Sequence, residues 1–404
     1  MTGVGSANLQ PPLKSKSEHY RNVPISRARL AAYNILLGVE RGAFSSDLLA
    51  RETATLASRD AGLAEEVALG VLRWRGAIDW IIQKLSGRPV QKLDREVLAA
   101  LRMGVYQLRW LDRVPAHAAI NESVELIKKA RKRSASGFAN AVLRKVTRDA
   151  VEWPDDATRL STPQWLLDNW SARYGATVAR GIAQAALQRP ERFVRIAPGA
   201  DVPAGLEATE VAGAYVGGAD GPQVQDISAQ AIVPLLDLQP GQTFLDLCSA
   251  PGNKTAQALE TAVHGIACDV SPERLQLVRR VGIPLVALDA TRPLPFARKF
   301  DRILVDVPCS GTGTLRRNPE IKWKLRPDDL ADLQRRQVAI LRHALAALAP
   351  GGRLVYSTCS LEPEENEAVP ALSRIGNVCY TMQRIPGRDR GDGFFAAVIT
   401  LDIT

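Results

Sequence analysis

Apolar positions in the first third of the chain recur at the spacing of an α-helix. Between residues 63 and 85 they follow one another in steps of three or four, which places them on one helical face. The members of this stripe are Leu63, Val67, Val71, Trp74, Ile78, Ile81 and Leu85. Asp60 stands at a suitable N-cap and Gly87 lies just past the end, so the pattern predicts one helix across the stretch.

Four more segments before residue 148 repeat this spacing, and no strand-like alternation interrupts them. Their apolar markers are Leu30, Tyr33 and Leu37; Val97, Leu101, Val105 and Leu108; Ile120, Val124 and Ile127; and Phe138, Val142 and Val146. The pattern predicts an all-α helical bundle over residues 23–148.

Residues 149–223 are richer in Pro and Gly and read as a connecting subdomain. One helix is predicted across Pro163–Leu187 and a short strand around Phe193–Ile196.

From residue 224 to 404, short apolar runs alternate with helical segments. Runs of this kind are typical of strands that are buried on both faces of a parallel sheet. They are TFLDLC, HGIACDVS, IPLVALDA, DRILVDVPC and GRLVYSTCS, with helices predicted near Lys254–Thr261, Pro272–Val281 and Pro327–Leu348. This alternation predicts an α/β domain with a doubly wound parallel sheet.

Composition narrows the class of protein. The 404 residues are 46% hydrophobic and 24% charged, which fits a globular protein of two or three domains. The first 22 residues lack an apolar core and read as a flexible, weakly basic tail rather than a secretory signal, and no run of the chain is apolar enough to cross a bilayer. Five cysteines without a CxxC pair argue against a disulfide framework and a zinc site, so we expect no metal and a reducing, cytoplasmic setting.

The net charge of +9 is distributed unevenly. Residues 1–148 carry 25 Lys and Arg against 13 Asp and Glu, whereas the rest carry 27 against 30. A basic front part indicates a polyanion-binding module, although a solvated basic surface would look the same.

The polar residues that close the predicted strands are the candidate site, because ligands of such sheets bind outside the carboxyl ends of the strands. The first strand runs through Asp246 into a loop of small residues followed by a helix: Cys248, Ser249, Ala250, Pro251, Gly252, Asn253 and Lys254. Such a loop lets the backbone approach a ligand closely. Its pattern is neither the dinucleotide-binding fingerprint nor the P-loop.

The later strands end in three carboxylates and two thiols. Asp269 closes the second strand at a place where a carboxylate commonly binds ribose, Asp289 closes the third, and Asp306, Cys309 and Cys359 close the last two. Taken singly, each Asp could be a helix N-cap and each Cys a small buried apolar residue. Taken together on one rim they predict a ligand site. Cys268 and Cys379 lie in apolar surroundings and are interpreted as packing residues.

The segments LDLCSAPGNKT, CDVSP, ALDAT, DVPCSGTG with RRNPEIKW, and YSTCSLEPEENE resemble the successive motifs of the NOL1/NOP2/Sun family. Members of that family are RNA cytosine-C5 methyltransferases that use S-adenosyl-L-methionine (AdoMet). The resemblance covers residues 224–404, and the front part is similar to the NusB fold, an RNA-binding bundle. It implies an all-α NusB-like bundle followed by a class I Rossmann-like AdoMet methyltransferase domain, the arrangement of a branch that acts on 16S ribosomal RNA.

The resemblance also implies roles for individual residues. Cys359 would be the nucleophile that attacks cytosine C6, Asp306 would contact the N3 edge of the base, and Cys309 would help to release the product. The loop 248–254 and Asp306 would bind AdoMet, with Asp269 at its ribose and Asp289 near its adenine amine.

From the residues themselves, a helix entered through Leu361, Glu362 and Pro363 is expected to direct its N-terminus toward Cys359 and favour a thiolate. The carboxylates of Glu362, Glu364 and Glu365 would oppose that effect, so both protonation states of the thiol stay open on the sequence.

Two residues depart from the family's usual loop, Cys-Ala-Ala-Pro-Gly-Gly-Lys. This chain has Ser249 and Asn253. Asn is the non-glycine residue that best tolerates a positive φ, so we expect Asn253 to preserve the loop while placing its side chain near the cofactor.

RNA is the expected partner of a chain that we expect to be monomeric. The cations after Cys309 are predicted to hold the RNA backbone, with Trp323 as a stacking face: Arg316, Arg317, Lys322, Lys324 and Arg326. In the front part, Lys128, Lys129, Arg131, Lys132 and Arg133 form the densest basic run, which is either a contact with RNA or plain surface.

Other functions remain open on the sequence. The substrate could be tRNA, or the chain could be a non-catalytic RNA-binding or ribosome assembly factor with a decayed methylase fold. A DNA cytosine methylase is disfavoured, because those enzymes rely on a Pro-Cys nucleophile and do not need the Thr-Cys motif.

Overall fold

The computed structural model describes residues 24–218 and 223–401, so the predicted tail over residues 1–22 lies outside the described residues. The described residues form two compact units. The first takes in residues up to 43, 47–68 and 81–150, and the second takes in 44–46, 69–80 and 151 onward.

The front part of the chain is helical, as its periodicity predicts. Its α-helices are α1 (Arg27–Glu40), α2 (Ser45–Thr53), α3 (Ser58–Arg73), α4 (Arg75–Ser86), α5 (Arg95–Trp110), α6 (Ala116–Lys129) and α7 (Ser136–Leu143), with short 3-10 turns η2 (Val90–Lys92) and η3 (Arg133–Ala135). The single helix predicted from residue 63 to 85 is wrong, because the chain breaks at Trp74 between α3 and α4. The apolar pattern does not reveal this break, because the buried residues continue on both sides of Trp74. They are Val67 and Val71 before it, and Ile78 and Ile81 after it.

A buried ion pair stabilises the first unit. Arg29 Nη1 lies 2.7 Å from Glu122 Oε1, and both side chains are only 8% exposed. Arg29 Nε also donates to Gln107 Oε1, and the backbone N–H and hydroxyl of Ser26 donate to Glu122 Oε2. The pair therefore has the additional hydrogen bonds that a buried charge requires.

The second unit begins with short helices and a small sheet. The helices are α8 (Asp156–Arg159), α9 (Gln164–Tyr174) and α10 (Ala176–Ala185). The helix predicted across Pro163–Leu187 is two helices, because Gly175 between them has a φ of +83°. The predicted strand is present as β1 (Phe193–Arg195), in an antiparallel sheet of order β2-β3-β1-β4 with β2 (Glu207–Ala208), β3 (Ala214–Val216) and β4 (Gln223–Val224).

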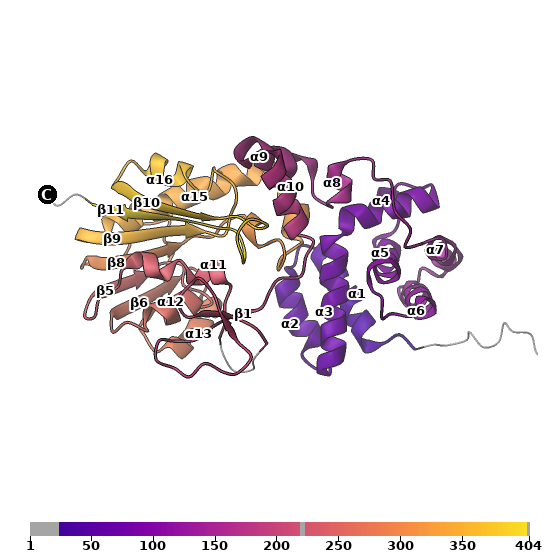
Figure 1. Cartoon of the computed structure of the whole chain (residues 1–404), viewed down its shortest axis with the longest axis horizontal. Coiled ribbons are helices and arrows are strands. Elements are labelled where there is room, and N and C mark those ends of the chain that lie inside the picture. The colour runs from indigo at the N-terminus through magenta and orange to yellow at the C-terminus, as the bar shows by residue number, and fades with distance from the viewer. Residues whose placement is uncertain (1–23, 219–222, 402–404) are drawn as a thin grey trace, which may run out of the picture. The chain divides into compact units, whose positions relative to one another are not determined.

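A seven-stranded sheet of order β10-β11-β9-β8-β5-β6-β7 forms the middle of the second unit (Figure 1). The five predicted strands are confirmed as parallel neighbours: β5 (Thr243–Asp246), β6 (His264–Asp269), β7 (Leu285–Ala287), β8 (Phe300–Asp306) and β9 (Leu348–Thr358). The sheet is mixed rather than purely parallel, because β10 (Asn377–Arg384) and β11 (Phe394–Thr400) extend it in the antiparallel sense.

Helices cover both faces of this sheet (Figure 1). Alternate strand residues such as Leu245, Ile303 and Leu354 pack with α15 (Pro327–Ala346) and α16 (Ala368–Ser373). Their neighbours, among them Phe244 and Leu304, pack against the other layer. That layer contains η4 (Val233–Leu236), α12 (Asn253–Ala258) and α13 (Pro272–Val278). The remaining short helices are α11 (Ile227–Gln230), η5 (Arg279–Val281), η6 (Thr312–Thr314) and α14 (Ile321–Lys324).

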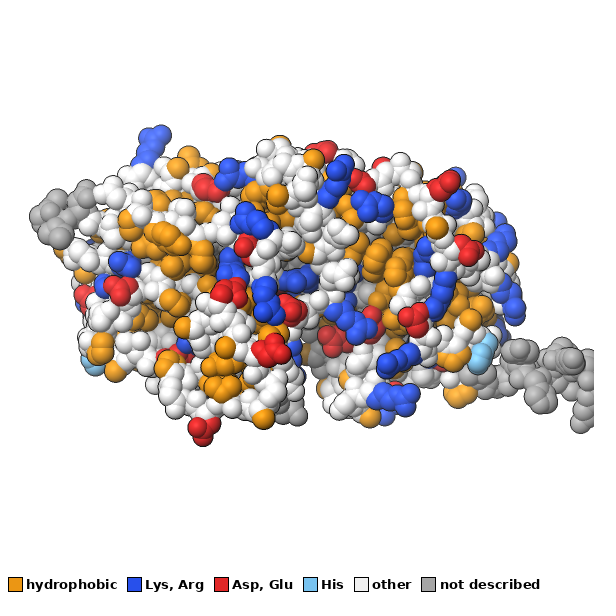
Figure 2. Space-filling view, in the orientation of Figure 1, with side chains coloured by type: hydrophobic (Ala, Val, Ile, Leu, Met, Phe, Trp, Pro, Cys, Tyr) orange, Lys and Arg blue, Asp and Glu red, His pale blue; other side chains and the backbone are white. Residues whose placement is uncertain are grey.

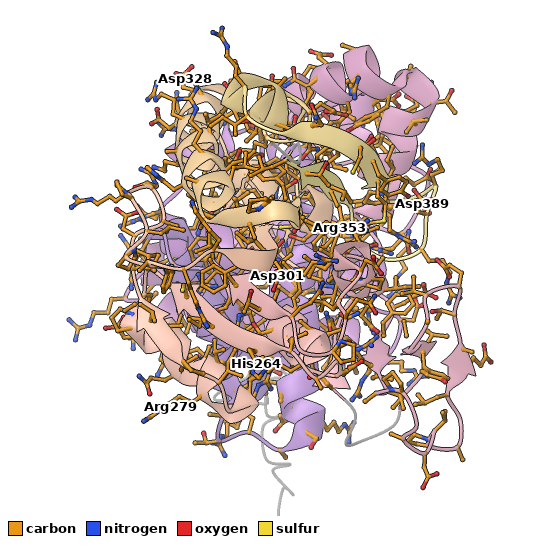
Figure 3. All side chains as sticks on the ribbon, turned by 90° about the vertical axis from the view of Figure 1, so that its left-hand side faces the viewer. His264, Arg279, Asp301, Asp328, Arg353 and Asp389 are labelled. Carbon is orange, nitrogen blue, oxygen red and sulfur yellow. The ribbon has the colours of Figure 1, made fainter. Side chains whose placement is uncertain are left out.

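The amino ends and the carboxyl ends of the parallel strands have different side chains. Figure 3 looks onto the amino ends of β6 and β8, where His264 and Asp301 lie, and also labels Arg353 in the middle of β9. There Asp301 Oδ2 accepts hydrogen bonds from the N–H and hydroxyl of Thr243, which is a structural contact. The candidate site lies at the carboxyl ends. In the part of the chain that the structure describes, no helix is long and apolar enough to span a bilayer.

Candidate active site

Two cavities lie at the carboxyl ends of the parallel strands. The first has a volume of about 660 Å³ and the second about 330 Å³. The first is lined by the five strand-end residues that the sequence analysis singles out: Asp269, Asp289, Asp306, Cys309 and Cys359. Their predicted convergence on one rim is thus found in the structure.

The loop after β5 faces both cavities. Cys248 and Ala250 line both, as do Asp306 and Cys359, so the two cavities meet at these four residues. Ser249, Pro251, Asn253 and Lys254 line only the second cavity. This division of the loop between two cavities could not be predicted from the sequence, in which residues 248–254 form one continuous stretch.

Gly252 lines neither cavity and has a structural role. Its φ is +97°, and a Cβ there would meet Val278 Cα at 3.3 Å. Glycine is therefore required for both conformation and close packing against α13.

The expectation for Asn253 is wrong. The positive φ of the loop belongs to Gly252, and Asn253 opens α12 in the ordinary helical region. Its Oδ1 accepts a hydrogen bond from Arg280 at 2.5 Å, and its Nδ2 donates weakly to the Val224 carbonyl at 3.4 Å. The side chain is thus held at the border of the second cavity, where Asn253 differs from the family's usual glycine.

The two thiols that close β8 and β9 touch one another. Cys309 Sγ lies 3.3 Å from Cys359 Sγ. This contact, together with burial, raises the pKa of the Cys309 thiol well above its usual value. Cys309 consequently keeps its proton, and at this distance either sulfur is able to donate a hydrogen bond to the other.

Asp306 is held on both carboxylate oxygens. Ser357 Oγ donates to Oδ1 at 2.8 Å, and Lys254 Nζ lies 2.6 Å from Oδ2. Burial by itself would lower the pKa of Lys254, but the Asp306 carboxylate outweighs it and raises that pKa above its ordinary value. Lys254 is therefore a permanent cation beside the thiols, and it also lies 5.0 Å from the centre of the Phe394 ring.

Backbone groups orient the two carboxylates farther along the rim. Asp269 accepts hydrogen bonds from the N–H groups of Ala250 and Ser271 and is 5% exposed. Asp289 accepts from the hydroxyl and N–H of Thr291, and these bonds lower the pKa of its carboxyl group. Backbone N–H groups thus fix the orientation of both side chains at the ends of their strands.

The helix predicted to begin at Leu361–Pro363 does not form there, which corrects the sequence expectation. Residues 363–367 form turns, and α16 begins only at Ala368. The loop is instead held by Glu365, which the sequence analysis missed. Its Oε1 accepts from Ser310 N at 2.8 Å and its Oε2 from Ser360 Oγ at 2.6 Å, so one buried carboxylate ties the residue after Cys309 to the residue after Cys359. The run of glutamates after the Thr-Cys motif was the available signal.

Most cations predicted to bind RNA have internal partners. Arg317 pairs with Asp226 and Asp392 at 2.8 and 2.7 Å, and Arg316 is bound to the Gly391 carbonyl. Lys322 is 1% exposed and donates to the Arg73 carbonyl. Lys322 is too buried to contact the RNA backbone, whereas the contacts predicted for Arg316 and Arg317 stay predictions.

Two other RNA candidates also have structural contacts. Trp323 Nε1 donates to the Leu72 carbonyl, and Arg75 lies 5.6 Å from the centre of its ring, so Trp323 is a packing residue rather than an open stacking face. Lys324 lies 4.9 Å from the centre of the Phe44 ring. Among the cysteines, Cys268 is buried as predicted, whereas Cys379 is exposed on β10.

The residues present fit a nucleoside bound through its sugar and joined to a polar end. The first cavity offers the Asp269 carboxylate together with apolar walls from Val270, Leu288 and Ile340, which suit a ribose and a base. At the second cavity, Ser249 Oγ is buried without a hydrogen-bond partner among the described residues. An unpaired buried polar atom of this kind is expected where a ligand completes the site.

A methyltransferase with a Rossmann-like sheet that takes its methyl group from AdoMet is the class of protein to which this architecture corresponds. Residues 233–374 match the family described as 16S rRNA methyltransferase RsmB/F, and residues 26–148 match the NusB family. The chain is 36% identical to ribosomal RNA small subunit methyltransferase B of Salmonella arizonae over 91% of its own length and 97% of the relative's. The protein of that name from Salmonella typhi matches to the same extent. The chain therefore belongs to the ribosomal RNA small subunit methyltransferase B family.

Solved structures share the fold. The crystal structure of PH0851 covers 94% of this chain and is itself covered to 99%, with a TM-score of 0.77 and 22% identity. A methyltransferase homologue from Pyrococcus horikoshii covers 62% of this chain and is covered fully, with a TM-score of 0.53 and 26% identity. NSun6 from the same organism, solved with SFG, covers 59% and is covered to 98%, with a TM-score of 0.50 and 18% identity.

Proposed function

We propose that this protein methylates C5 of a cytosine in small-subunit ribosomal RNA through a transient covalent bond between Cys359 and C6 of the base. The observation that carries the proposal is the 3.3 Å contact between the sulfurs of Cys309 and Cys359 at the junction of the two cavities. Ribosomal RNA is the substrate named for the relatives that match most of this chain.

Cysteine chemistry solves the central difficulty of this reaction, which is that C5 of cytosine is a poor nucleophile. Addition of the Cys359 sulfur to C6 turns the ring into an enamine, whose C5 can accept a methyl group. AdoMet, when bound, supplies that methyl group from a sulfonium. Donation from the Cys309 thiol stabilises the thiolate of Cys359 before the attack.

The pair of Asp306 and Lys254 deals with the charge that forms on the ring. The Asp306 carboxyl group, held by Ser357, would protonate or hydrogen-bond the N3 edge of the base, where negative charge builds as the sulfur adds. The Lys254 ammonium at 2.6 Å from Asp306 offsets the negative charge that develops when the sulfur adds. Because both groups are fixed before the reaction, little reorganisation is needed.

Release of the product requires the C5 proton to leave as the bond from C6 to sulfur breaks. Cys309 can pass its proton to the departing Cys359 sulfur and take the C5 proton in exchange. The electrons of the C5–H bond then restore the C5–C6 double bond, and both thiols are regenerated.

The binding roles follow from the cavities. In the first, Asp269 would hold the ribose of AdoMet and Asp289 would lie near the adenine amine. For the RNA backbone, the exposed cations at the end of α6 remain candidates: Lys129, Arg131 and Arg133. These cations lie in the segment that matches the NusB family. We also propose that the protein is a monomer when it acts on RNA.

Substitution of each thiol separates the two sulfur roles. Cys359→Ala should abolish transfer of a labelled methyl group to RNA while AdoMet still binds. Cys309→Ala should methylate slowly and accumulate a protein–RNA adduct that appears as a shifted band on a denaturing gel. Cys379→Ala is the matched control, because its thiol is exposed on β10, and it should behave as wild type.

Two results would contradict the proposal. Wild-type activity in Cys359→Ala would remove the nucleophile, and the absence of an adduct with an authentic substrate would remove the release role of Cys309. Bisulfite sequencing of ribosomal and transfer RNA from a deletion strain tests the substrate. Loss of a methylated cytosine from tRNA alone would favour the tRNA alternative, and a failure to bind AdoMet would favour a non-catalytic assembly factor.

A further inference from the structure

The two thiols at the carboxyl ends of β8 and β9 lie close enough for oxidation to join them. Cys309 Sγ and Cys359 Sγ are 3.3 Å apart, and both residues are free thiols in the structure. A small movement of the two side chains would bring the sulfurs to bonding distance. The pair is thus available for a second reaction besides methylation.

The backbone next to both thiols is held in place. The strands β8 and β9 are parallel neighbours, with Asp306 paired to Ser357 at their ends. Beyond the strands, the buried Glu365 carboxylate accepts hydrogen bonds from Ser310 N at 2.8 Å and from Ser360 Oγ at 2.6 Å. The residues that follow the two cysteines are therefore tied to one carboxylate, which keeps the sulfurs near one another.

A small oxidant is able to reach the pair. Cys309 and Cys359 are partly exposed, and both line the first cavity of about 660 Å³. The Lys254 ammonium, held by Asp306 at 2.6 Å, interacts electrostatically with Cys359. A nearby cation and access to solvent are the surroundings in which cysteines react with oxidants.

We propose that Cys309 and Cys359 form a reversible disulfide bond when hydrogen peroxide enters the first cavity, and that this bond switches methyl transfer off. The Cys359 sulfur, as a thiolate, attacks one oxygen of the peroxide and becomes a sulfenic acid, and the hydroxide that leaves takes up the thiol proton to form water. The Cys309 sulfur then attacks the Cys359 sulfur, and its proton leaves with the second hydroxide as water. Two thiols and one peroxide thus give one disulfide and two waters.

The bond would inactivate and protect the same sulfur. It occupies the proposed nucleophile, and a thiol reductant regenerates both cysteines. Without a second thiol, a sulfenic acid is oxidised further to a sulfinic acid, which is irreversible under ordinary conditions. Cys309 is then the resolving thiol that prevents this loss at Cys359. The effect of the bond on methyl transfer rests on the proposed function, whereas its formation does not.

Peptide mapping by mass spectrometry after treatment with hydrogen peroxide tests the bond directly. In the wild type, the peptides that contain residues 309 and 359 should be linked, methyl transfer should stop, and dithiothreitol should reverse both changes. Cys309→Ser should form no such link, and its Cys359 should reach the sulfinic acid, which dithiothreitol does not reduce. Cys379→Ala is the matched control, because it removes an exposed thiol on β10 and should form the link as the wild type does.

Several outcomes would overturn the inference. Cys248 also lines both cavities, and a link from Cys359 to Cys248 would give the resolving role to another thiol. A sulfinic acid at Cys359 that forms as fast in the wild type as in Cys309→Ser would show that Cys309 does not resolve it. Methyl transfer that continues in fully linked protein would remove the switch. A reduced wild-type protein that forms the link on oxidation but never methylates RNA would instead overturn the proposed function.

Discussion

Burial alters the chemistry of single carboxyl groups in the second unit. Loss of water around the charged form raises the pKa of Glu362 to about 7, and the same cause raises the pKa of Asp392 to about 6. Trp170 Nε1 donates to Glu362 Oε1 at 3.0 Å, and this bond and a hydrogen bond with Thr312 partly oppose the effect of burial. This group lies three residues after Cys359, so the proton is held in the loop that carries this cysteine.

We predict that Glu362→Gln flattens the dependence of stability on pH. The folded protein holds the Glu362 proton up to about pH 7, whereas the unfolded chain releases it near 4.5. The stability from this proton is therefore complete below pH 4.5 and is lost as the pH rises to about 7, a change of about 3 kcal/mol at most. Urea unfolding at pH 5.5 and pH 8 should show a smaller difference in the variant. Glu207→Gln, on an exposed strand, should retain the wild-type difference.

At the scale of elements, close backbone contacts bring the two thiol loops together. Gly313 N donates to the Cys359 carbonyl at 2.9 Å, and Gly393 N donates to the Gly313 carbonyl at 2.8 Å. A Cβ on Gly313 would lie 2.1 Å from the Gly393 carbonyl oxygen, a distance that no side chain tolerates. The loop after β8, the end of β9 and the start of β11 thus meet only because these positions lack side chains.

Gly313→Ala should therefore displace the loops and lower methyl transfer at least tenfold, together with the melting temperature. Activity and thermal unfolding measured on the same preparation are the test. Gly62→Ala is the matched control, because Gly62 lies in α3 with no atom near its added Cβ. That change should raise stability by up to about 1 kcal/mol and leave activity intact. Normal activity in Gly313→Ala would show that the close approach is not needed.

At the scale of the whole molecule, the described residues form two compact units, and the excess of cations lies in residues 1–148. The excess of cations before residue 148 does not form one continuous patch on the face seen in Figure 2, where Lys and Arg lie among acidic and apolar side chains. Inside the first unit, the Arg29–Glu122 pair is buried, and loss of one partner would leave an uncompensated charge. Stability of the first unit is thus expected to change independently of the cofactor site.

Glu122→Ala should destabilise the first unit by about 3–5 kcal/mol and leave S-adenosylhomocysteine binding to the second unit unchanged. Thermal unfolding with and without this ligand measures both effects, because only the unit that binds the ligand is stabilised by it. The double variant Arg29→Met with Glu122→Leu should recover most of the loss. A fall in ligand affinity in parallel with stability would contradict the independence of the units.

Local patterns in the sequence were sufficient for the elements and for the rim. The periods of 3.6 and of buried strands are properties of neighbouring residues, so most helices of the front part and the five parallel strands could be predicted from them. The short helix α2 and the antiparallel strands β10 and β11 were not predicted. In a parallel sheet the carboxyl ends of all strands lie on the same side, which is why Asp269, Asp306 and Cys359 could be expected together. The breaks at Trp74 and Gly175 were missed, because the same apolar face continues across each of them.

Only the tertiary structure decided which polar groups face a ligand. A cation has the same sequence signal whether it meets solvent or a distant carboxylate, and Arg317 meets Asp226 and Asp392, far away along the chain. The same holds for the unpaired hydroxyl of Ser249 and for the contact between the two sulfurs. Sequence determines which elements form, because that depends on neighbours. The partners of a buried polar atom depend on residues that folding brings together.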